Sequence, residues 1–328
     1  MAKLKFDFVA LERSGKVDRN DRSGITRGMR RRTFLIRMAG LFVAGVLLFL
    51  VIQGVVSIFV SILKRPETGA NGGTETESAK VSLTLLLFKE PDDRSDIEYL
   101  TLVRLDPQNG RATLTPIPAE LVIDGKDLHQ YYHTAGGEAG CALAVQKLLD
   151  ADKIYYSAVN NYRLSRLLNK FGGVTLDWRY IVIYQDPDDK KRSPSYPDQW
   201  IRSITVSPEK RTFSGSEVIR LLNWPEWPGG LDSKRDFYAQ MWCNFINEQL
   251  VYKNIGKLPD FYLLIYRNSV TELSQDQFQN ALAGLESLCE INQNGNIASV
   301  VLIPPTVADG QLVYDEDALE NLRALYGD

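Results

Sequence analysis

The stretch that decides the fold is residues 81–117, VSLTLLLFKEPDDRSDIEYLTLVRLDPQNGRATLTPI. It contains three short apolar runs, at 81–88, 99–105 and 111–117, and the turn-forming sequence Asp-Pro-Gln-Asn-Gly at 106–110 separates the second run from the third. Apolar runs of this length that are bounded by turn residues are typical of β-strands. The stretch therefore predicts three strands.

The segments that follow predict a mixture of helices and strands. Two further apolar runs, at 261–266 and 297–303, predict strands. Apolar residues at helical spacing predict helices at 140–149, 162–171, 214–222, 234–251, 276–288 and 315–325. Because helices and strands alternate, we expect a layered α/β domain over residues 80–328. No sequence period repeats, which argues against a solenoid.

A long apolar segment precedes this domain. Residues 38–63 contain no charged side chain, and a helix of about 20 residues is enough to cross a bilayer. The alternative is a cleaved signal peptide, whose apolar region is about 7–15 residues long and ends at small residues. This segment is longer and ends in Leu63-Lys64-Arg65-Pro66. We therefore expect one uncleaved transmembrane helix.

The charge distribution predicts how the chain is oriented. Residues 1–37 carry eleven Lys and Arg against four Asp and Glu, although the whole chain has a formal charge of −3. Basic residues next to a membrane span favour the cytoplasmic side. We expect a basic cytoplasmic tail at 1–37, a flexible polar stalk at 64–79, and an extracellular domain at 80–328. This organisation predicts a single-pass protein of the cell membrane.

The arginines at 27 and 30–32 have two explanations, contact with anionic lipid or contact with nucleic acid. A basic segment beside a membrane span ordinarily meets anionic lipid. The acidic chain as a whole, with a pI of about 5.6, argues against broad nucleic-acid binding. We favour the membrane explanation and expect no nucleic-acid partner.

Short motifs in a fixed order identify a family resemblance for residues 80–328. They stand at 85–87 (Leu-Leu-Leu), 94–96 (Arg-Ser-Asp), 106–107 (Asp-Pro), 114–120, 135–137, 143–149, 155–156, 169–174, 213–217, 232–240, 268–288 and 314–318. In this order and spacing, the domain resembles the LytR-CpsA-Psr family of cell-envelope proteins. The resemblance implies an α/β/α sandwich whose apolar pocket holds a polyprenyl chain. It also implies transfer of a glycopolymer from a polyprenyl-pyrophosphate carrier to peptidoglycan, with membrane lipid as a further partner.

The resemblance assigns roles to three residues near the first strand. Arg94 stands at the arginine of the family's Arg-Ser-Asp motif and would clamp pyrophosphate, while Asp96 would be a magnesium ligand. Glu90 is the nearest equivalent of a second acid in the family, and it is one methylene longer. Magnesium prefers carboxylate oxygens together with substrate phosphate. The resemblance thus implies magnesium on Asp96 and Glu90.

A second set of implied site residues lies in the motif at 232–240. Asp232 and Arg235 match the first two charged positions of the family's Asp-x-x-Arg-x-x-Arg-Gln pattern. The resemblance makes Asp232 a base or a second metal partner, and Arg235 a pyrophosphate ligand. Tyr238 and Ala239 replace the second arginine and the glutamine.

Other positions depart further from the family pattern. Ala119, Asn223 and Pro225 stand where arginines are usual. Removal of one preorganised donor typically costs about 10²–10³ in rate. Lys89 and Lys234 lie nearby, but a lysine does not reproduce the bidentate fork of arginine.

Two functional hypotheses follow from this comparison. The first is a membrane-anchored glycopolymer-peptidoglycan phosphotransferase. The second is a catalytically degenerate envelope protein that binds a polyprenyl lipid or has a regulatory role. A third class, a transcription factor, is disfavoured because only 37 residues would face the cytoplasm and they show no helix-turn-helix pattern.

The two histidines and three cysteines of the chain do not form a recognisable metal-binding motif. His129 and His133 are four residues apart and could share a helix face, but the sequence offers no evident third ligand. Cys141, Cys243 and Cys289 lack Cys-x-x-Cys spacing. Outside the membrane, one pair could form a disulfide and leave the third cysteine free, but we favour buried thiols.

Tryptophans are concentrated around Asp232, at positions 224, 227 and 242. Their indoles could cover a lipid or a sugar, or they could simply pack in the core.

Overall fold

The computed structural model describes residues 81–134, 136–186, 189 and 202–327. The predicted tail, transmembrane segment 38–63 and stalk lie outside the described residues. Within the described part, no helix has both the length and the apolar character needed to span a bilayer.

The core of the domain is a mixed six-stranded sheet with the order β11-β6-β1-β2-β3-β12. Its centre is an antiparallel meander of the three predicted strands, and their pairing runs from Leu83↔Leu105 to Leu100↔Ile117. The strands are β1 (Leu83–Lys89), β2 (Tyr99–Asp106), β3 (Arg111–Ile117), β6 (Tyr155–Val159), β11 (Val270–Thr271) and β12 (Ala298–Val300). Because β6 pairs parallel to β1 and β12 pairs parallel to β3, helical connections link them on the faces of the sheet.

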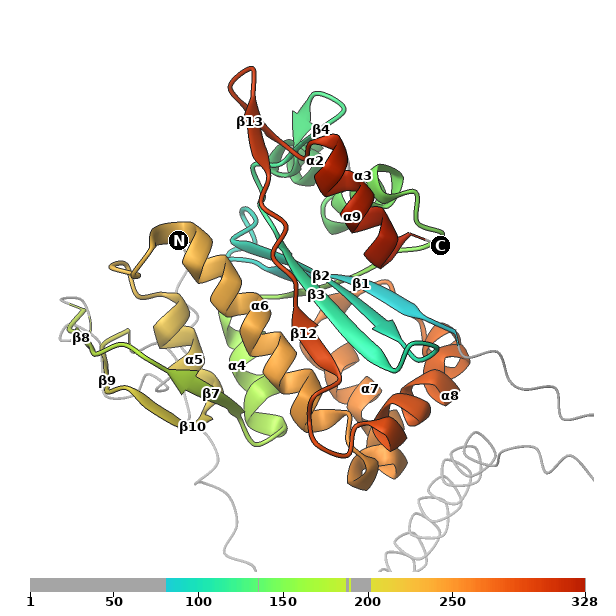
Figure 1. The fold of residues 1–328 in the computed structure, drawn as a ribbon. Helices are drawn as coiled ribbons and strands as arrows, with labels where there is room; N and C mark the ends of the chain where they lie inside the picture. Colours follow the sequence, from blue (N-terminus) through green and yellow to red (C-terminus); the bar gives the residue numbers. More distant parts are fainter. Residues whose placement is uncertain (1–80, 135, 187–188, 190–201, 328) are drawn as a thin grey trace, which may run out of the picture. The chain divides into compact units, whose positions relative to one another are not determined.

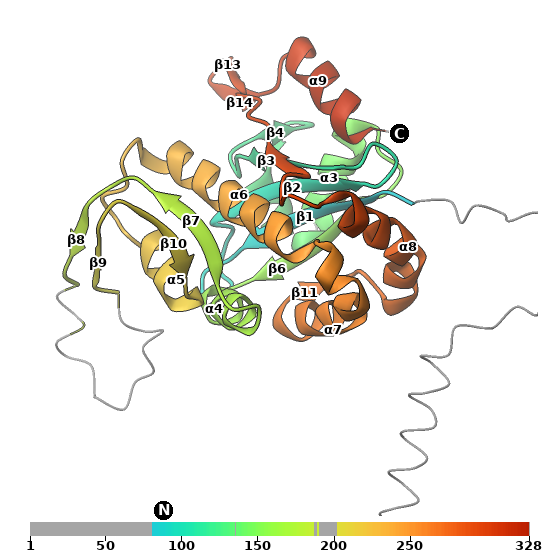
Figure 2. The same cartoon turned by 60° about the horizontal axis from the view of Figure 1, so that its bottom comes forward.

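Helices cover both faces of this sheet, so the domain has three layers (Figures 1 and 2). On one side are α2 (Leu128–Thr134), α3 (Glu138–Leu149) and α9 (Glu316–Tyr326). On the other are α4 (Asn161–Lys170), α5 (Gly215–Leu222), α6 (Gly230–Gln249), α7 (Leu258–Asn268) and α8 (Gln275–Ile291).

Strand β1 shows how the sequence divides the two cores. Successive side chains of a strand point to opposite faces. Leu83 and Leu87 accordingly join the core under α4–α8, whereas Leu86 and Phe88 join the core under α3 and α9. The nearly continuous apolar run of β1 therefore reflects burial on both faces.

The run at 261–266 was wrongly predicted as a strand, because it lies in helix α7. A six-residue apolar run is ambiguous between helix and strand. Pro259 in the first turn and the buried pair Leu258 and Tyr262, four residues apart, are the helical signals. The strand predicted at 297–303 is confirmed only over Ala298–Val300.

The remaining elements form small additions to the sandwich. They are β4 (Val122–Ile123), β5 (Lys126–Asp127), β7 (Val174–Trp178), β8 (Val182–Tyr184), β9 (Ile204–Val206), β10 (Glu209–Phe213), β13 (Thr306–Ala308), β14 (Gln311–Val313) and the 3₁₀-helix η3 (Tyr252–Lys257). Strand β7 pairs with β10, and Gly173 before it has a φ of 95°, where an added Cβ would lie 2.4 Å from the carbonyl oxygen of Phe213. Only glycine fits that close approach.

Candidate functional site

Arg94 lies in the turn between β1 and β2, where its guanidinium is held by two carboxylates. Its Nε donates to Oε2 of Glu90 at 3.0 Å, and its second arm pairs with Glu138 at the start of α3. The other oxygen of Glu90 accepts a hydrogen bond of 3.0 Å from the Tyr132 hydroxyl. Burial, together with the neighbouring Glu138, raises the pKa of Glu90.

Asp96 faces different partners from those of Glu90. Its Oδ1 lies 2.7 Å from Nδ1 of His129 and 3.4 Å from Nε2 of His133, and it accepts a bond of 2.8 Å from the Ile97 amide. The two histidines share one face of α2, as their spacing predicts, and Asp96 is the carboxylate that the sequence did not connect to them.

The implied magnesium site does not fit this arrangement. Both oxygens of Glu90 are engaged by Arg94 and Tyr132, while Asp96 contacts the histidines instead. Among the residues that the structure describes, no three or more His, Cys, Asp or Glu side chains are arranged to hold a metal ion. Both oxygens of Glu90 and Oδ1 of Asp96 thus already have partners, and no step below depends on magnesium.

Arg235 is also held between two carboxylates. It lies in the first half of α6 and is 8% exposed. One arm donates to Oδ1 of Asp232 at 2.7 Å, one helical turn away, and the other donates to Oε2 of Glu120 at 2.8 Å. Glu120 directly follows Ala119, the buried residue at a position where the family resemblance expects an arginine.

The predicted site residues thus fall into three separate sets. Arg94 and Glu90 form the first with Glu138 and Tyr132; Asp96 forms the second with the histidines; Asp232 and Arg235 form the third with Glu120. Sequence reasoning missed the carboxylates that complete the first and third sets. Displacing either carboxylate pair to admit a diphosphate would cost free energy, because paired charges lose their partners.

Two lysines stand close to these sets. Lys89, the last residue of β1, is completely buried and pairs with Glu98, and burial lowers its pKa to about 7. Lys234 on α6 donates a bond of 2.9 Å to the carbonyl oxygen of Trp224, and burial lowers its pKa to about 8. Within the described residues Lys234 has no carboxylate partner.

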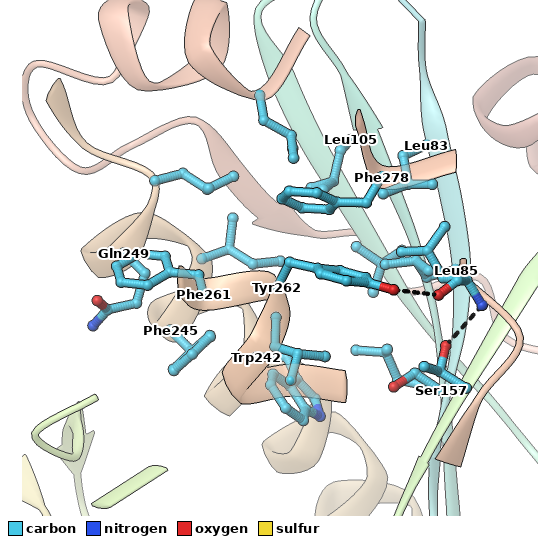
Figure 3. Close-up of a pocket in the computed structure, with 18 of the residues that line it drawn as sticks. Leu83, Leu85, Leu105, Ser157, Trp242, Phe245, Gln249, Phe261, Tyr262 and Phe278 are labelled. Carbon is cyan, nitrogen blue, oxygen red and sulfur yellow. Dashed lines mark hydrogen bonds between the residues drawn. The ribbon is translucent and has the colours of Figure 1, made fainter. Parts of the chain in front are cut away.

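An apolar cavity lies between the sheet and helices α6–α8 (Figure 3). Its volume is about 150 Å³. Leu83, Leu85 and Leu105 line the sheet side, while Trp242 and Phe278 face them from the helices. An apolar cavity of similar size in another protein stays dry and binds small hydrocarbons. This cavity therefore suits a hydrocarbon segment.

The cluster of tryptophans is part of the core. Trp224 and Trp227 are buried with ring centroids 5.9 Å apart, and Trp227 lies 4.9 Å from Phe237. Of the three tryptophans, only Trp242 lines the apolar cavity. Cys141, Cys243 and Cys289 are free and buried, as predicted.

Solved structures with the same fold cover most of the chain. A proposed transcription regulator from Eubacterium siraeum matches with a TM-score of 0.65 at 14% identity, covering 80% of this chain and 99% of its own. TagV of B. subtilis matches with a TM-score of 0.59 at 16% identity, and the match covers 75% of this chain and 96% of TagV. The domain has the fold of the LytR-CpsA-Psr family.

The same LytR-CpsA-Psr fold occurs in a structure of TagT bound to LIIa-WTA, with a TM-score of 0.57 and 14% identity over 79% of this chain and 96% of TagT. The predicted resemblance is thus confirmed for the fold. No family model matches the chain, and no curated protein matches it in sequence. At these identities the likeness shows the fold alone, and the chemistry has to be argued from the residues of this chain.

Proposed function

We propose that this chain is a divergent LytR-CpsA-Psr protein of the cell membrane whose extracellular domain binds the polyprenyl chain of a carrier-linked glycopolymer. The observation that carries the proposal is the apolar cavity between β1, β2 and helices α6–α8. Its size suits one segment of an isoprenoid rather than a whole polyprenyl chain. A longer chain would fit only if the helices that cover the cavity, such as α7 and α8, moved outward.

We further propose that binding of the carrier outweighs its turnover. Arg94 and Arg235 are each held by two carboxylates, and Ala119, Asn223 and Pro225 replace family arginines. The positive charge that arginines would bring to a leaving phosphate is therefore neutralised or missing. This arrangement favours the carrier-binding hypothesis over efficient transfer to peptidoglycan.

Binding is tested with the full-length chain in phospholipid nanodiscs, titrated with geranylgeraniol as a short isoprenoid probe. The proposal expects saturable binding with one probe per chain. Absence of saturable binding would reject it.

Transfer itself is the second candidate, and one observation favours it. The Asp232 side chain is 87% exposed beside Arg235, so its carboxylate could accept a proton from an acceptor hydroxyl. The hydroxyl oxygen would then form a bond to phosphorus, and the bond to the polyprenyl phosphate would break. Release of polyprenyl phosphate from a carrier-linked glycan, lost in Asp232→Asn, would establish this candidate. Release that is absent, or equal in the variant, would exclude it.

A further inference from the structure

An open groove lies along helix α6, which runs between strands β7 and β12 (Figure 1). One wall is formed by β7 and the residues directly after it, and the other is formed by residues between 294 and 302. The groove has a volume of about 1010 Å³. Binding sites for small ligands typically have volumes of about 300–1,000 Å³, so the groove has room for a ligand.

The groove is separate from the apolar cavity. Trp242 and Phe245 of α6 line the cavity, whereas Phe237, Gln240 and Asn244 of the same helix line the groove. Among the described residues, none lines both spaces. Helix α6 therefore presents different residues to two different hollows, and a ligand in the groove does not compete with one in the cavity.

Carboxamides are the commonest polar side chains in the groove. They belong to Gln240, Asn244, Asn247, Asn294 and Asn296, of which Gln240, Asn294 and Asn296 are exposed. The Gln240 amide donates to Oδ1 of Asn244 at 2.8 Å, which helps to fix its direction. A carboxamide both donates and accepts hydrogen bonds, as a hydroxyl group does. This lining thus suits a ligand that is rich in hydroxyl groups.

The charges in the groove nearly cancel. Asp177, Asp236 and Glu248 stand against Arg179 and Lys210, so no excess of positive charge attracts an anionic polymer. Arg179 lies 3.6 Å from Asp177, and Glu248 accepts a backbone amide. Within the described part of the chain, the Asp236 carboxylate has no hydrogen-bond or ion-pair partner. It can therefore accept hydrogen bonds from a ligand.

A tyrosine held by other rings provides an apolar surface in the groove. Tyr180 is 45% exposed, and its ring lies 5.5 Å from that of Trp178 at an angle of 73°. Trp178 packs in turn against Trp227 and Phe237, with centroid distances of 5.4 and 5.6 Å. An aromatic side chain that is already ordered offers contact area at a low cost in conformational entropy.

An extended peptide is the other ligand that such groups could hold, but strand β7 is poorly prepared for one. Peptides that add to a sheet bond to free backbone groups on a strand edge. On β7, the amide of Thr175 donates to Glu248 at 2.8 Å, and its carbonyl oxygen accepts from Asn244 at 2.9 Å. Side chains of α6 thus already occupy the backbone groups of Thr175.

We propose that this groove binds an uncharged oligosaccharide, with Tyr180 packed against one sugar ring. Gln240, Asn296 and Asp236 would then bond to its hydroxyl groups. A sugar ring has an apolar face and a rim of hydroxyl groups, and the groove offers both an ordered aromatic ring and carboxamides. The inference goes beyond the proposed lipid binding, because the two ligands would occupy separate spaces.

The test titrates the full-length chain in phospholipid nanodiscs with two uncharged probes, chitotetraose and cellotetraose. We expect at least one of them to bind saturably, with one probe per chain. A sulfated heparin tetrasaccharide should bind more weakly, because the groove has no excess of positive charge. An end-capped tetra-alanine peptide should not bind.

Variants then locate the site. Gln240→Ala should weaken binding of the sugar about three- to tenfold, as the loss of one hydrogen bond allows. Tyr180→Ala should weaken it about fivefold or more, because it removes the exposed ring. The matched controls are Gln279→Ala on α8 and Tyr266→Ala on α7, two exposed residues outside the groove, and neither should change binding. Binding of geranylgeraniol should be the same in all four variants and the parent.

Four results would overturn the inference. The first is that neither uncharged sugar binds, and the second is that Tyr180→Ala and Gln240→Ala bind the sugar as the parent does. The third is tighter binding of the sulfated sugar, which would indicate an anion site. The fourth is binding of the peptide in place of the sugars. None of these results bears on the proposed function, which is tested separately by geranylgeraniol.

Discussion

Arg235 donates to Glu120 with an N–O distance of 2.8 Å, across 115 positions of sequence. Glu120 comes directly after Ala119, so a carboxylate points at Arg235 from the segment that was expected to supply a second guanidinium. Because Ala119 supplies no second cation, the positive charge of Arg235 is neutralised by Glu120 and Asp232. This neutralisation is the main structural reason for preferring binding of a carrier over its efficient turnover.

Glu120→Gln is expected to strengthen binding of geranylgeranyl monophosphate several-fold, because Arg235 loses a competing anion. Stability should change by no more than about 1 kcal/mol, since the Glu120 side chain is about half exposed. Titration and chemical denaturation of the full-length chain measure the two effects. Glu209→Gln, which removes an exposed partner of Arg211, is the control and should leave binding unchanged. Equal affinity in Glu120→Gln and the parent would contradict the competition.

Tyr238→Phe is expected to stabilise the free protein by about 1 kcal/mol, because it removes a buried hydroxyl that has no partner in the described structure. Tyr326→Phe is the matched variant. The Tyr326 hydroxyl, also buried, donates to the Thr115 hydroxyl at 2.8 Å and lies 3.3 Å from the Leu102 carbonyl oxygen, so its loss should destabilise by about 1–3 kcal/mol. Urea denaturation measures both. A loss of stability in Tyr238→Phe equal to that in Tyr326→Phe would mean that the Tyr238 hydroxyl is satisfied.

Acid should weaken the start of helix α5 through Glu217. Partial burial alone would raise the pKa of Glu217, but hydrogen bonds from Arg211 and Ser214 lower it to about 2. The unfolded value is near 4.5, so the unfolded chain binds this proton first as pH falls. Its contribution is therefore complete above pH 4.5 and is lost between pH 4.5 and 2.

Glu217→Gln tests this contribution. The variant should lose about 1–2 kcal/mol at pH 7 and show a flatter decline of stability below pH 4.5. Glu316→Gln, at an exposed position in α9, should follow the parent. Parallel stability curves for the parent and Glu217→Gln would show that the capping carboxylate does not contribute.

The sequence predicted the layers of the domain better than the site. Strands β1–β3 were predictable because short apolar runs and the turn at 106–110 are local signals. Helix α7 was missed because the apolar run at 261–266 is continuous and shows no helical spacing by itself. The spacing becomes visible only when Leu258, four residues before Tyr262, is included.

Site residues were identified by motif, but their partners were not. Glu138 lies 44 positions from Arg94 and Glu120 lies 115 from Arg235, and no local pattern connects such pairs. Asp96 contacts both histidines only because α2 packs against the turn that holds it. Magnesium on Asp96 and Glu90 was an expectation from the motif alone, and the motif did not indicate that Arg94, Tyr132 and the histidines contact these carboxylates.

The most direct test of the account is to fill the cavity. Leu85→Phe places a ring in the apolar cavity, and Leu86→Phe changes the next residue of β1, which faces the opposite core. Overpacking Leu86 should cost about 1–3 kcal/mol of stability without touching the cavity.

The deciding measurement is geranylgeraniol binding to the full-length parent and to both variants in nanodiscs. The account predicts that Leu85→Phe weakens binding at least about tenfold, while folded Leu86→Phe binds as the parent does. Equal binding by the parent and Leu85→Phe would contradict it, because the chain would then occupy another site.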